Sequence, residues 1–247
     1  MNCEVLTLFP KIVEAAVGDS ILKRAAEKGL VKIKVTDIRD FTKDRHKTAD
    51  DAPFGGGPGM VMKPEPVFEA VEAAQRGAEA RIMLMSPQGP AFNHEKALEL
   101  SKETRKLIFI CGRYEGIDER VRSLADEELS LGDFVLSGGE IAAAAVIEAT
   151  ARLIPGVLGD DESAGLDSFY DGLLDYPHYT RPAEYRGLQV PDVLLSGNHA
   201  EIRRWRRKEA LRATMSKRPD LLQKVTLKPE DKKLLAELEK EKLTQEK

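Results

Sequence analysis

Three apolar stretches of the sequence end in short loops whose side chains suit ligand binding. Residues 107–121 read LIFICGRYEGIDERV, so an apolar run breaks at Cys111-Gly112 into a cation, an aromatic ring and a carboxylate. Residues 81–90 (RIMLMSPQGP) and 133–140 (DFVLSGGE) repeat the pattern. Alone, residues 112–116 fit an ordinary charged turn better than a site for an adenine ring and a ribose. Because ligands of open α/β sheets bind where strands end, the three exits together predict one shared crevice.

The glycine-rich residues 51–60 (DAPFGGGPGM) leave two interpretations open. They lack the Lys-Ser/Thr ending of a P-loop and the spacing of the dinucleotide fingerprint, so the pattern does not indicate phosphate binding. The glycines suit a sharp turn with positive φ angles, and such a loop also suits a place beside a substrate. The sequence favours neither interpretation over the other.

A basic run in residues 201–218 contrasts with an acidic chain. This segment carries eight Lys or Arg against two Glu, whereas the whole protein has a net charge of −4. With such a concentration of charge, two interpretations of the segment are equally favoured: a helix that contacts RNA phosphates and an ordinary solvated helix. Arg203, Arg206 and Arg207 are the candidate RNA contacts, and Trp205 is predicted to pack in a core rather than stack on a base.

The sequence lacks the residue patterns of several other catalytic chemistries. The four histidines form no HExxH pattern and no Cys/His cluster for zinc, and no Gly-x-Ser-x-Gly elbow indicates acyl transfer. Cys3 and Cys111 lie in apolar runs and are predicted as core residues rather than a disulfide. No segment approaches the roughly 18 apolar residues of a membrane span. Because the first residues also lack a signal-peptide pattern, we expect a cytoplasmic protein with no membrane partner.

The elements that must position these loops follow from an alternation of short apolar runs and helical stretches. This alternation predicts an α/β fold with a mostly parallel sheet flanked by helices. Ser137 and Glu140 fit a capping box that starts an alanine-rich helix over residues 141–153. The expected elements, the last of them a strand, span residues 4–9, 20–28, 31–38, 65–74, 81–85, 95–102, 107–111 and 133–136.

Composition divides the chain into three parts. Residues 1–160 form the expected α/β domain, and the acidic, aperiodic residues 161–172 form an expected flexible linker. Residues 173–247 are predicted as a small helical C-terminal domain that binds RNA, because they contain the basic run. Its helices are expected over residues 198–215, 220–225 and 229–243.

Seven motifs in this order resemble the bacterial tRNA (guanine-N1)-methyltransferases of the SPOUT superfamily. The resemblance runs nearly end to end and implies a deep trefoil knot in the α/β domain, a homodimer and the cofactor S-adenosylmethionine. It also implies methylation of N1 of the guanine immediately 3′ of the anticodon, position 37 of the tRNA. True knots are rare, so no periodicity in the sequence predicts one. The motifs are residues 50–60, 86–89, 111–121, 132–140, 152–159, 167–182 and 194–206.

The same resemblance implies roles for individual residues. Asp167 matches the family's catalytic base, which removes the proton from N1, and Arg152 matches the arginine that offsets charge on the guanine carbonyl oxygen. Family members are described as magnesium-dependent, and Asp167, Asp171 and Asp175 are candidates to attract the ion, with its ligands unknown. The residues expected to bind S-adenosylmethionine are Ser86, Pro87, Gly112, Tyr114, Glu115, Ser130, Leu131, Gly132, Leu136, Gly138 and Gly139.

Two alternative functions remain open at this point. One is a tRNA-binding protein that keeps the fold and the basic helix without catalysis, and the other is a knotted enzyme that methylates a ribose hydroxyl. Asp167 together with Arg152 favours methylation of a base. The identity of the methylated atom separates the two enzymes.

Overall fold

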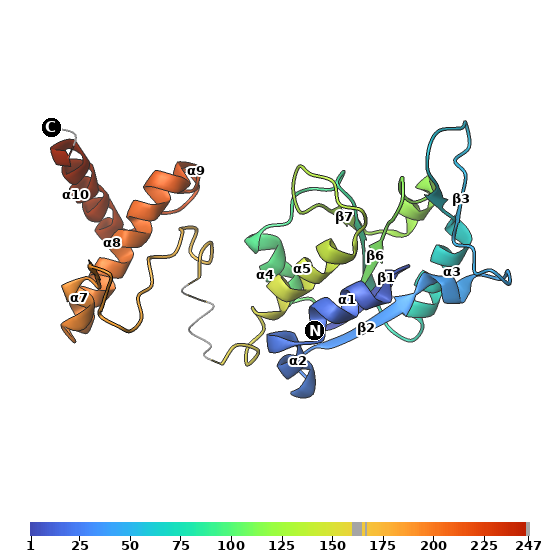
Figure 1. The fold of residues 1–247 in the computed structure, drawn as a ribbon, viewed down its shortest axis with the longest axis horizontal. Helices are drawn as coiled ribbons and strands as arrows, with labels where there is room; N and C mark the ends of the chain where they lie inside the picture. Colours follow the sequence, from blue (N-terminus) through green and yellow to red (C-terminus); the bar gives the residue numbers. More distant parts are fainter. Residues whose placement is uncertain (160–164, 166, 246–247) are drawn as a thin grey trace. The chain divides into compact units, whose positions relative to one another are not determined.

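The protein consists of two compact units, Met1–Asp161 and Glu162–Lys247, in a computed structural model that describes residues 1–159, 165 and 167–245 (Figure 1). The division falls close to residue 160, the predicted end of the first domain. Residues 161–164 and 166 of the predicted linker lie outside the described residues. Residues 167–172 form turns in the second unit, where the Phe169 N–H donates to the Leu173 carbonyl at 2.7 Å.

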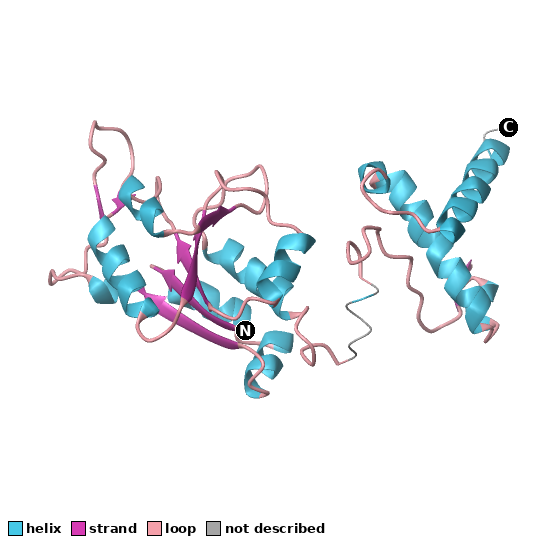
Figure 2. Cartoon of the chain, turned by 180° about the vertical axis from the view of Figure 1, so that it is seen from behind, coloured by secondary structure: helices cyan, strands magenta, loops and turns pink. Residues whose placement is uncertain are grey.

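A five-stranded parallel sheet forms the centre of the first unit (Figures 1 and 2). Its strands lie in the order β2-β1-β6-β5-β7, which confirms the predicted α/β fold with a mostly parallel sheet. Met85 pairs with both Cys111 and Leu129, so three adjacent strands end side by side. The strands are β1 (Asn2–Thr7), β2 (Lys32–Asp37), β5 (Ala80–Met85), β6 (Lys106–Cys111) and β7 (Glu127–Leu129).

Helices cover both faces of this sheet, and each face has its own apolar core. In β6, Phe109 and Cys111 face one core whereas Ile108 and Ile110 face the other. Strands buried on both faces have continuous apolar sequences, as these do. The first core includes Cys3 and Cys111, as predicted, and side chains of α1 (Pro10–Val17), α2 (Ser20–Glu27), α4 (His94–Ser101) and α5 (Glu140–Ala151). The second includes side chains of α3 (Pro64–Gln75) and of the 3-10 helices Ile38–Phe41 and Glu119–Leu124.

Two local predictions near the third loop are wrong. Residues 133–136 form a loop rather than a strand, and their apolar side chains are exposed, Phe134 by 54% and Val135 by 84%. The capping box of Ser137 does not form, because α5 has Gly139 as its N-cap residue with no side-chain cap. Glu140 is instead buried and accepts a hydrogen bond from the Thr7 hydroxyl at 2.7 Å. The Glu140 carboxylate therefore binds a residue of β1 instead of capping its own helix.

The glycine-rich loop of the first unit is closed by a short antiparallel pair, β3 (Asp50–Asp51) and β4 (Val61–Met62). Gly55, Gly56, Gly57 and Gly59 all have positive φ angles. L-residues with side chains rarely adopt this conformation, so the loop requires glycine there. Phe54 is fully exposed on the loop.

The second unit is a small helical unit with a short hairpin. Its longest helix, α8, matches the helix predicted over residues 198–215, and the side chain of Asn198 caps it. Leu173, Leu211, Leu234 and Leu238 form its buried core. Its elements are β8 (Glu184–Tyr185), β9 (Leu188–Gln189), α7 (Asp192–Leu195), α8 (His199–Lys217), α9 (Pro219–Leu222) and α10 (Pro229–Gln245).

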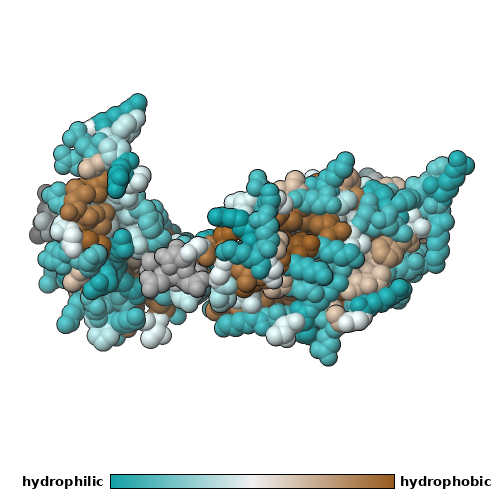
Figure 3. Space-filling view, turned by 90° about the horizontal axis from the view of Figure 1, so that it is seen from below, coloured by the Kyte–Doolittle hydropathy of each residue, from teal (hydrophilic) through white to brown (hydrophobic). Residues whose placement is uncertain are grey.

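The surface of both units is mainly hydrophilic, with a hydrophobic area on each in the view of Figure 3. Within the described part of the chain, no helix has both the length and the apolar character that a membrane crossing requires.

Candidate functional site

A cavity of about 210 Å³ lies at the carboxyl ends of β5, β6 and β7. The loops that follow these strands form it together, so the structure contains the crevice predicted from the strand exits. Backbone hydrogen bonds join the loops to one another: the Ser86 N–H donates to the Leu129 carbonyl and the Gly139 N–H to the Gly112 carbonyl, both at 3.0 Å. Residues predicted to bind a cofactor that line the cavity are Ser86, Pro87, Gly112, Tyr114, Glu115, Ser130, Leu131, Leu136, Gly138 and Gly139.

Gly132 is the one predicted cofactor residue that does not line this cavity. The Gly132 carbonyl accepts a hydrogen bond from the Ser130 hydroxyl at 3.0 Å. The Gly132 N–H donates to the Ser130 hydroxyl oxygen, also at 3.0 Å. Its φ angle of 145° lies in the region that favours glycine. Gly132 therefore shapes the loop that carries Ser130.

Gly139 allows the third loop to pack directly on the ends of the strands. A Cβ atom at this position would lie 2.9 Å from both the Cys111 Cα and the Met85 Cβ. Any larger residue would hold the loop away from the sheet. The absence of a side chain at Gly139 is therefore a condition for closing the cavity.

The charges around the cavity leave one carboxylate without a partner. Both arginines that line it are paired: Arg113 lies 3.2 Å from Glu140, and Arg122 forms ion pairs with Glu119 and Glu128. Among the residues that the structure describes, Glu115 forms no ion pair. The cavity therefore favours a ligand that carries positive charge over an anionic one.

Arg113 lines the cavity, and its side chain is also held by structural contacts. Its guanidinium lies over the ring of Phe9, 4.3 Å from the centroid, and donates to the Ser137 carbonyl at 3.2 Å. It also pairs with the buried Glu140, which in turn accepts from Thr7. This chain of contacts joins the ends of β1 and β6 to the start of α5.

The glycine-rich loop lies against the second loop of the cavity. The Glu115 N–H donates to the Met60 carbonyl at 3.0 Å, and a Cβ atom on Gly59 would lie 2.4 Å from the Glu115 Cγ. Gly59 thus gives the Glu115 side chain its space. Both interpretations of the loop have support. Its glycines adopt positive φ angles, as a sharp turn requires, and its last residue, Met60, contacts Glu115 beside the cavity.

Tyr114 is held in an unusual backbone conformation at the rim of the cavity. Its φ angle is 60°, in the left-handed region that a bulky residue rarely adopts. Partial burial and the neighbouring Asp50 carboxylate raise the pKa of its phenol, so Tyr114 stays protonated and can donate a hydrogen bond. Strain of this kind is frequent at binding sites.

The two predicted catalytic residues belong to different units. Arg152 is half-buried at the end of α5 in the first unit. Asp167 lines a cavity of about 180 Å³ in the second unit, shared with Arg203, Arg206 and Arg207 of α8. The structure therefore brings the predicted catalytic carboxylate together with the three predicted tRNA contacts.

The acidic residues suggested for magnesium do not form a metal cluster. Across residues 1–159, 165 and 167–245, no group of three or more His, Cys, Asp or Glu side chains is arranged to hold a metal ion. Asp171 forms an ion pair with Arg207, and Asp175 lies 2.7 Å from the His178 Nε2. Because both carboxylates already have partners, these residues do not fit a magnesium site.

The basic run is largely neutralised, which the sequence alone did not indicate. Arg207 forms an ion pair of 2.7 Å with the buried Asp231, and the two carboxylates beside it raise its pKa further. Across the described ranges, Arg203, Arg206 and Lys217 are the basic residues of the run without an ion pair. The paired ones are Arg204 with Glu237, Arg207 with Asp171 and Asp231, Lys208 with Glu237 and Glu241, Arg212 with Glu209 and Glu241, and Arg218 with Asp220.

A parallel sheet with a cavity at the carboxyl ends of adjacent strands defines an open α/β protein, and this edge of the sheet is where such proteins bind their ligands. The family model described as tRNA (Guanine-1)-methyltransferase TrmD matches residues 1–224. The chain therefore belongs to this family, which confirms the resemblance seen in its motifs.

Individual relatives match over almost their whole length. The chain is 57% identical over 242 residues to the tRNA (guanine-N(1)-)-methyltransferase of Geobacter sp. (strain M21), and the match covers 97% of each chain. It is 54% identical over 241 residues to the protein of the same name from Dictyoglomus turgidum, with 98% of each chain covered.

Proposed function

We propose that this protein transfers a methyl group from S-adenosylmethionine to N1 of the guanine immediately 3′ of the anticodon, position 37 of tRNA. Family membership and relatives of the same name along nearly the whole chain support a tRNA (guanine-N1)-methyltransferase. The structural observation that carries the proposal is the cavity at three strand ends, lined by ten of the residues expected to hold the cofactor.

The residues that line the cavity support S-adenosylmethionine as its ligand. Leu129, Leu131 and Leu136 give it apolar walls that suit an adenine ring, and Glu115 offers a carboxylate to the positive charge of the cofactor. When bound, the cofactor supplies a methyl group activated on a positively charged sulfur. The leaving thioether is neutral, so the transfer requires no general acid.

The residues of this chain would then act on the guanine. Asp167 accepts the N1 proton, and Arg152 stabilises the negative charge that develops on the carbonyl oxygen. Arg203 and Arg206 beside Asp167 remain available for the tRNA backbone, because neither is paired within the described residues. Arg207 is committed to Asp231, so we expect its contribution to binding to be indirect.

Family membership also supports a trefoil knot in the first unit, a homodimer, tRNA binding by the second unit and action in the cytoplasm, where the substrate is present. The close packing of the loops after β5, β6 and β7 agrees with a knot at this edge of the sheet. Proton abstraction by Asp167 accounts for catalysis without a metal ligand set.

The decisive experiment combines methyl transfer with direct binding of the cofactor. The protein is incubated with radiolabelled S-adenosylmethionine and a tRNA transcript that has guanine after the anticodon, and digestion with mass spectrometry locates the methyl group. Wild type should place it on N1. Asp167→Asn should lower the rate by about 10²–10⁴-fold, the usual contribution of a general base, without changing cofactor affinity measured by calorimetry.

A matched control separates this effect from a general loss of charge. Asp220→Asn removes an exposed carboxylate elsewhere in the second unit and should leave the rate unchanged. A methyl group on ribose contradicts base methylation, and binding of tRNA without any transfer supports a non-catalytic binding protein. Equal loss of cofactor affinity and turnover in Asp167→Asn would contradict its role as the base.

A further inference from the structure

The second unit contains a second cavity, of about 390 Å³, for which the proposed function has no use. It lies between residues 176–183 and the helices α7 and α8, which pack side by side (Figure 1). We call it the aromatic pocket, after the residues Tyr176, His178, Tyr179 and Trp205 in its wall. Such a concentration of rings is unusual in a chain in which only 6% of residues are Phe, Trp or Tyr.

Tyr179 and Trp205 offer partly open faces for stacking, whereas Tyr176 and His178 lie against each other with their centroids 4.7 Å apart. Tyr179 and Trp205 are tilted by 54° with their centroids 6.4 Å apart, which is too far for a closed stack. Tyr179 is 49% exposed, and Leu195 at the opening is 60% exposed. A flat apolar group is the natural occupant of such a space, because nucleobases in single-stranded RNA stack on aromatic side chains.

The charge of the pocket favours an anionic partner. Its wall includes Arg181 and Arg206 but no Asp or Glu from the part of the chain that the structure describes. The Arg206 guanidinium lies over the Tyr176 ring, 5.0 Å from the centroid, and has no acidic partner among the described residues. This contrasts with the neighbouring Arg204 and Arg207, both of which form ion pairs. An unpaired guanidinium at the edge of an aromatic pocket suits the phosphate of a nucleotide whose base enters the pocket.

The pocket also adjoins the cavity that contains Asp167. Tyr176 and Arg206 line both cavities, so the two share a wall within one unit. A nucleic acid strand that presents one base to Asp167 therefore passes Arg206 before a further base can reach the aromatic pocket.

We propose that the aromatic pocket binds a second unpaired nucleobase of the substrate RNA, with Arg206 contacting the phosphate backbone between this base and the target guanine. The inference rests on the proposed function for the identity of the RNA. It assigns Tyr179, Leu195 and Trp205 to RNA recognition. Trp205 is half-buried and lies outside the apolar core of the second unit, in contrast to the sequence prediction that it packs in a core.

Trp205 is the one tryptophan of the chain and therefore reports directly on the pocket. Its fluorescence is followed while the full-length protein is titrated with an unmodified tRNA transcript. The titration is repeated with transcripts in which one loop nucleotide at a time lacks its base. We expect the intact transcript to change the fluorescence, and removal of one base other than the target guanine to abolish the change and to raise Kd at least fivefold.

Pocket variants connect that nucleotide with the protein. Tyr179→Ala and Leu195→Ala change exposed side chains and should preserve the fold, which circular dichroism verifies. Each should raise Kd for the intact tRNA at least fivefold and have no further effect on the transcript that lacks the recognised base. Tyr179→Phe keeps the ring and should bind as wild type, as should the control Leu243→Ala on α10.

The outcomes separate this inference from the proposed function. If wild type methylates N1 but Tyr179→Ala and Leu195→Ala bind every transcript as wild type does, the pocket proposal is wrong and the enzyme assignment stands. If the fluorescence change depends on one base while no methyl group is transferred, the enzyme assignment fails and the pocket proposal stands. A fluorescence change that is the same for every transcript also contradicts the pocket proposal.

Discussion

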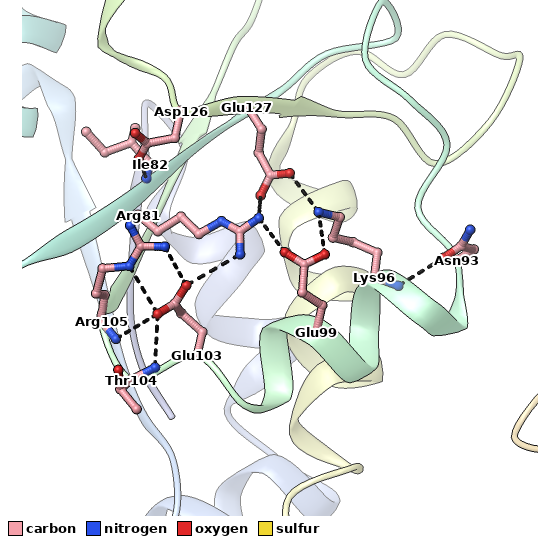
Figure 4. A network of polar contacts seen from close by, with 10 residues as sticks. All are labelled: Arg81, Ile82, Asn93, Lys96, Glu99, Glu103, Thr104, Arg105, Asp126 and Glu127. Carbon is pink, nitrogen blue, oxygen red and sulfur yellow. Dashed lines mark hydrogen bonds and ion pairs between the residues drawn. The ribbon is translucent and has the colours of Figure 1, made fainter.

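The two ends of the parallel sheet in the first unit differ sharply in how their charges are used. At the amino ends of β5 and β7, Arg81 contacts Glu99, Glu103 and Glu127, and Lys96 joins the same network (Figure 4). At the carboxyl ends, Glu115 has no ion pair within the described part of the chain. The ion-pair network at the amino ends therefore contributes stability, whereas the carboxyl ends keep one described carboxylate, that of Glu115, outside their ion pairs. Variants at the two ends should affect different measurements.

The largest effect is expected from Gly139→Ala at the carboxyl end. Its new Cβ would clash with the Cys111 Cα and the Met85 Cβ at 2.9 Å, and backbone atoms must move to relieve the clash. We expect the Kd for S-adenosylmethionine, measured by calorimetry, to rise at least about tenfold, and the free energy of unfolding to fall by about 1–3 kcal/mol. Gly159→Ala is the control, because no atom of the described residues lies within 4 Å of a Cβ there. An unchanged Kd in Gly139→Ala would show that the loop does not form the cofactor site.

A smaller effect, on stability alone, is expected from Arg81→Met at the amino end. Arg81 is 15% exposed, and its loss leaves the mainly buried Glu103 and Glu127 short of a partner. Urea unfolding should show a loss of about 1–2 kcal/mol with unchanged affinity for S-adenosylmethionine. Arg120→Met breaks a surface pair with Asp118 and should cost less than about 1 kcal/mol. A change in cofactor affinity in Arg81→Met would remove the distinction between the two ends.

The smallest effect concerns the pH dependence of stability. Hydrogen bonds from Arg105, followed by those from Arg81, lower the pKa of Glu103 from 4.5 to about 2. A lowered pKa in the folded state stabilises the protein above the unfolded value, and this stabilisation is lost as pH falls from about 4.5 to 2. Urea unfolding at several pH values should therefore show that the difference between wild type and Glu103→Gln decreases over this interval. A constant difference would indicate that the Glu103 charge does not contribute.

The sequence predicted the elements whose signal is local. Continuous apolar runs followed by glycine or serine identified β5 and β6 together with their loops, and the amphipathic pattern over residues 198–215 identified α8. Apolar character alone misled at residues 133–136, because Phe134 and Val135 are exposed in a loop, while the short, acidic β7 (Glu127–Leu129) was missed.

What the sequence could not predict depends on partners far along the chain. Glu140 fits a helix cap locally, but its carboxylate accepts a hydrogen bond from Thr7, which is 133 residues away in the sequence. The basic run in α8 suggested RNA contact, but Glu237 and Glu241 of α10 neutralise much of it. The aromatic pocket likewise combines residues 176–183 with α7 and α8, and no single motif contains it.

The position of β1 within the sheet has a consequence for synthesis of the protein. Cys3 of β1 pairs with Leu107 of β6, so about 100 further residues are synthesised before β1 can pair with its second neighbouring strand. At typical elongation rates of about 5–20 residues per second, β1 spends roughly 5–20 seconds with an open strand edge before β6 is synthesised. An open edge is a template for association with other chains, so the nascent protein is most vulnerable to aggregation before β6 leaves the ribosome.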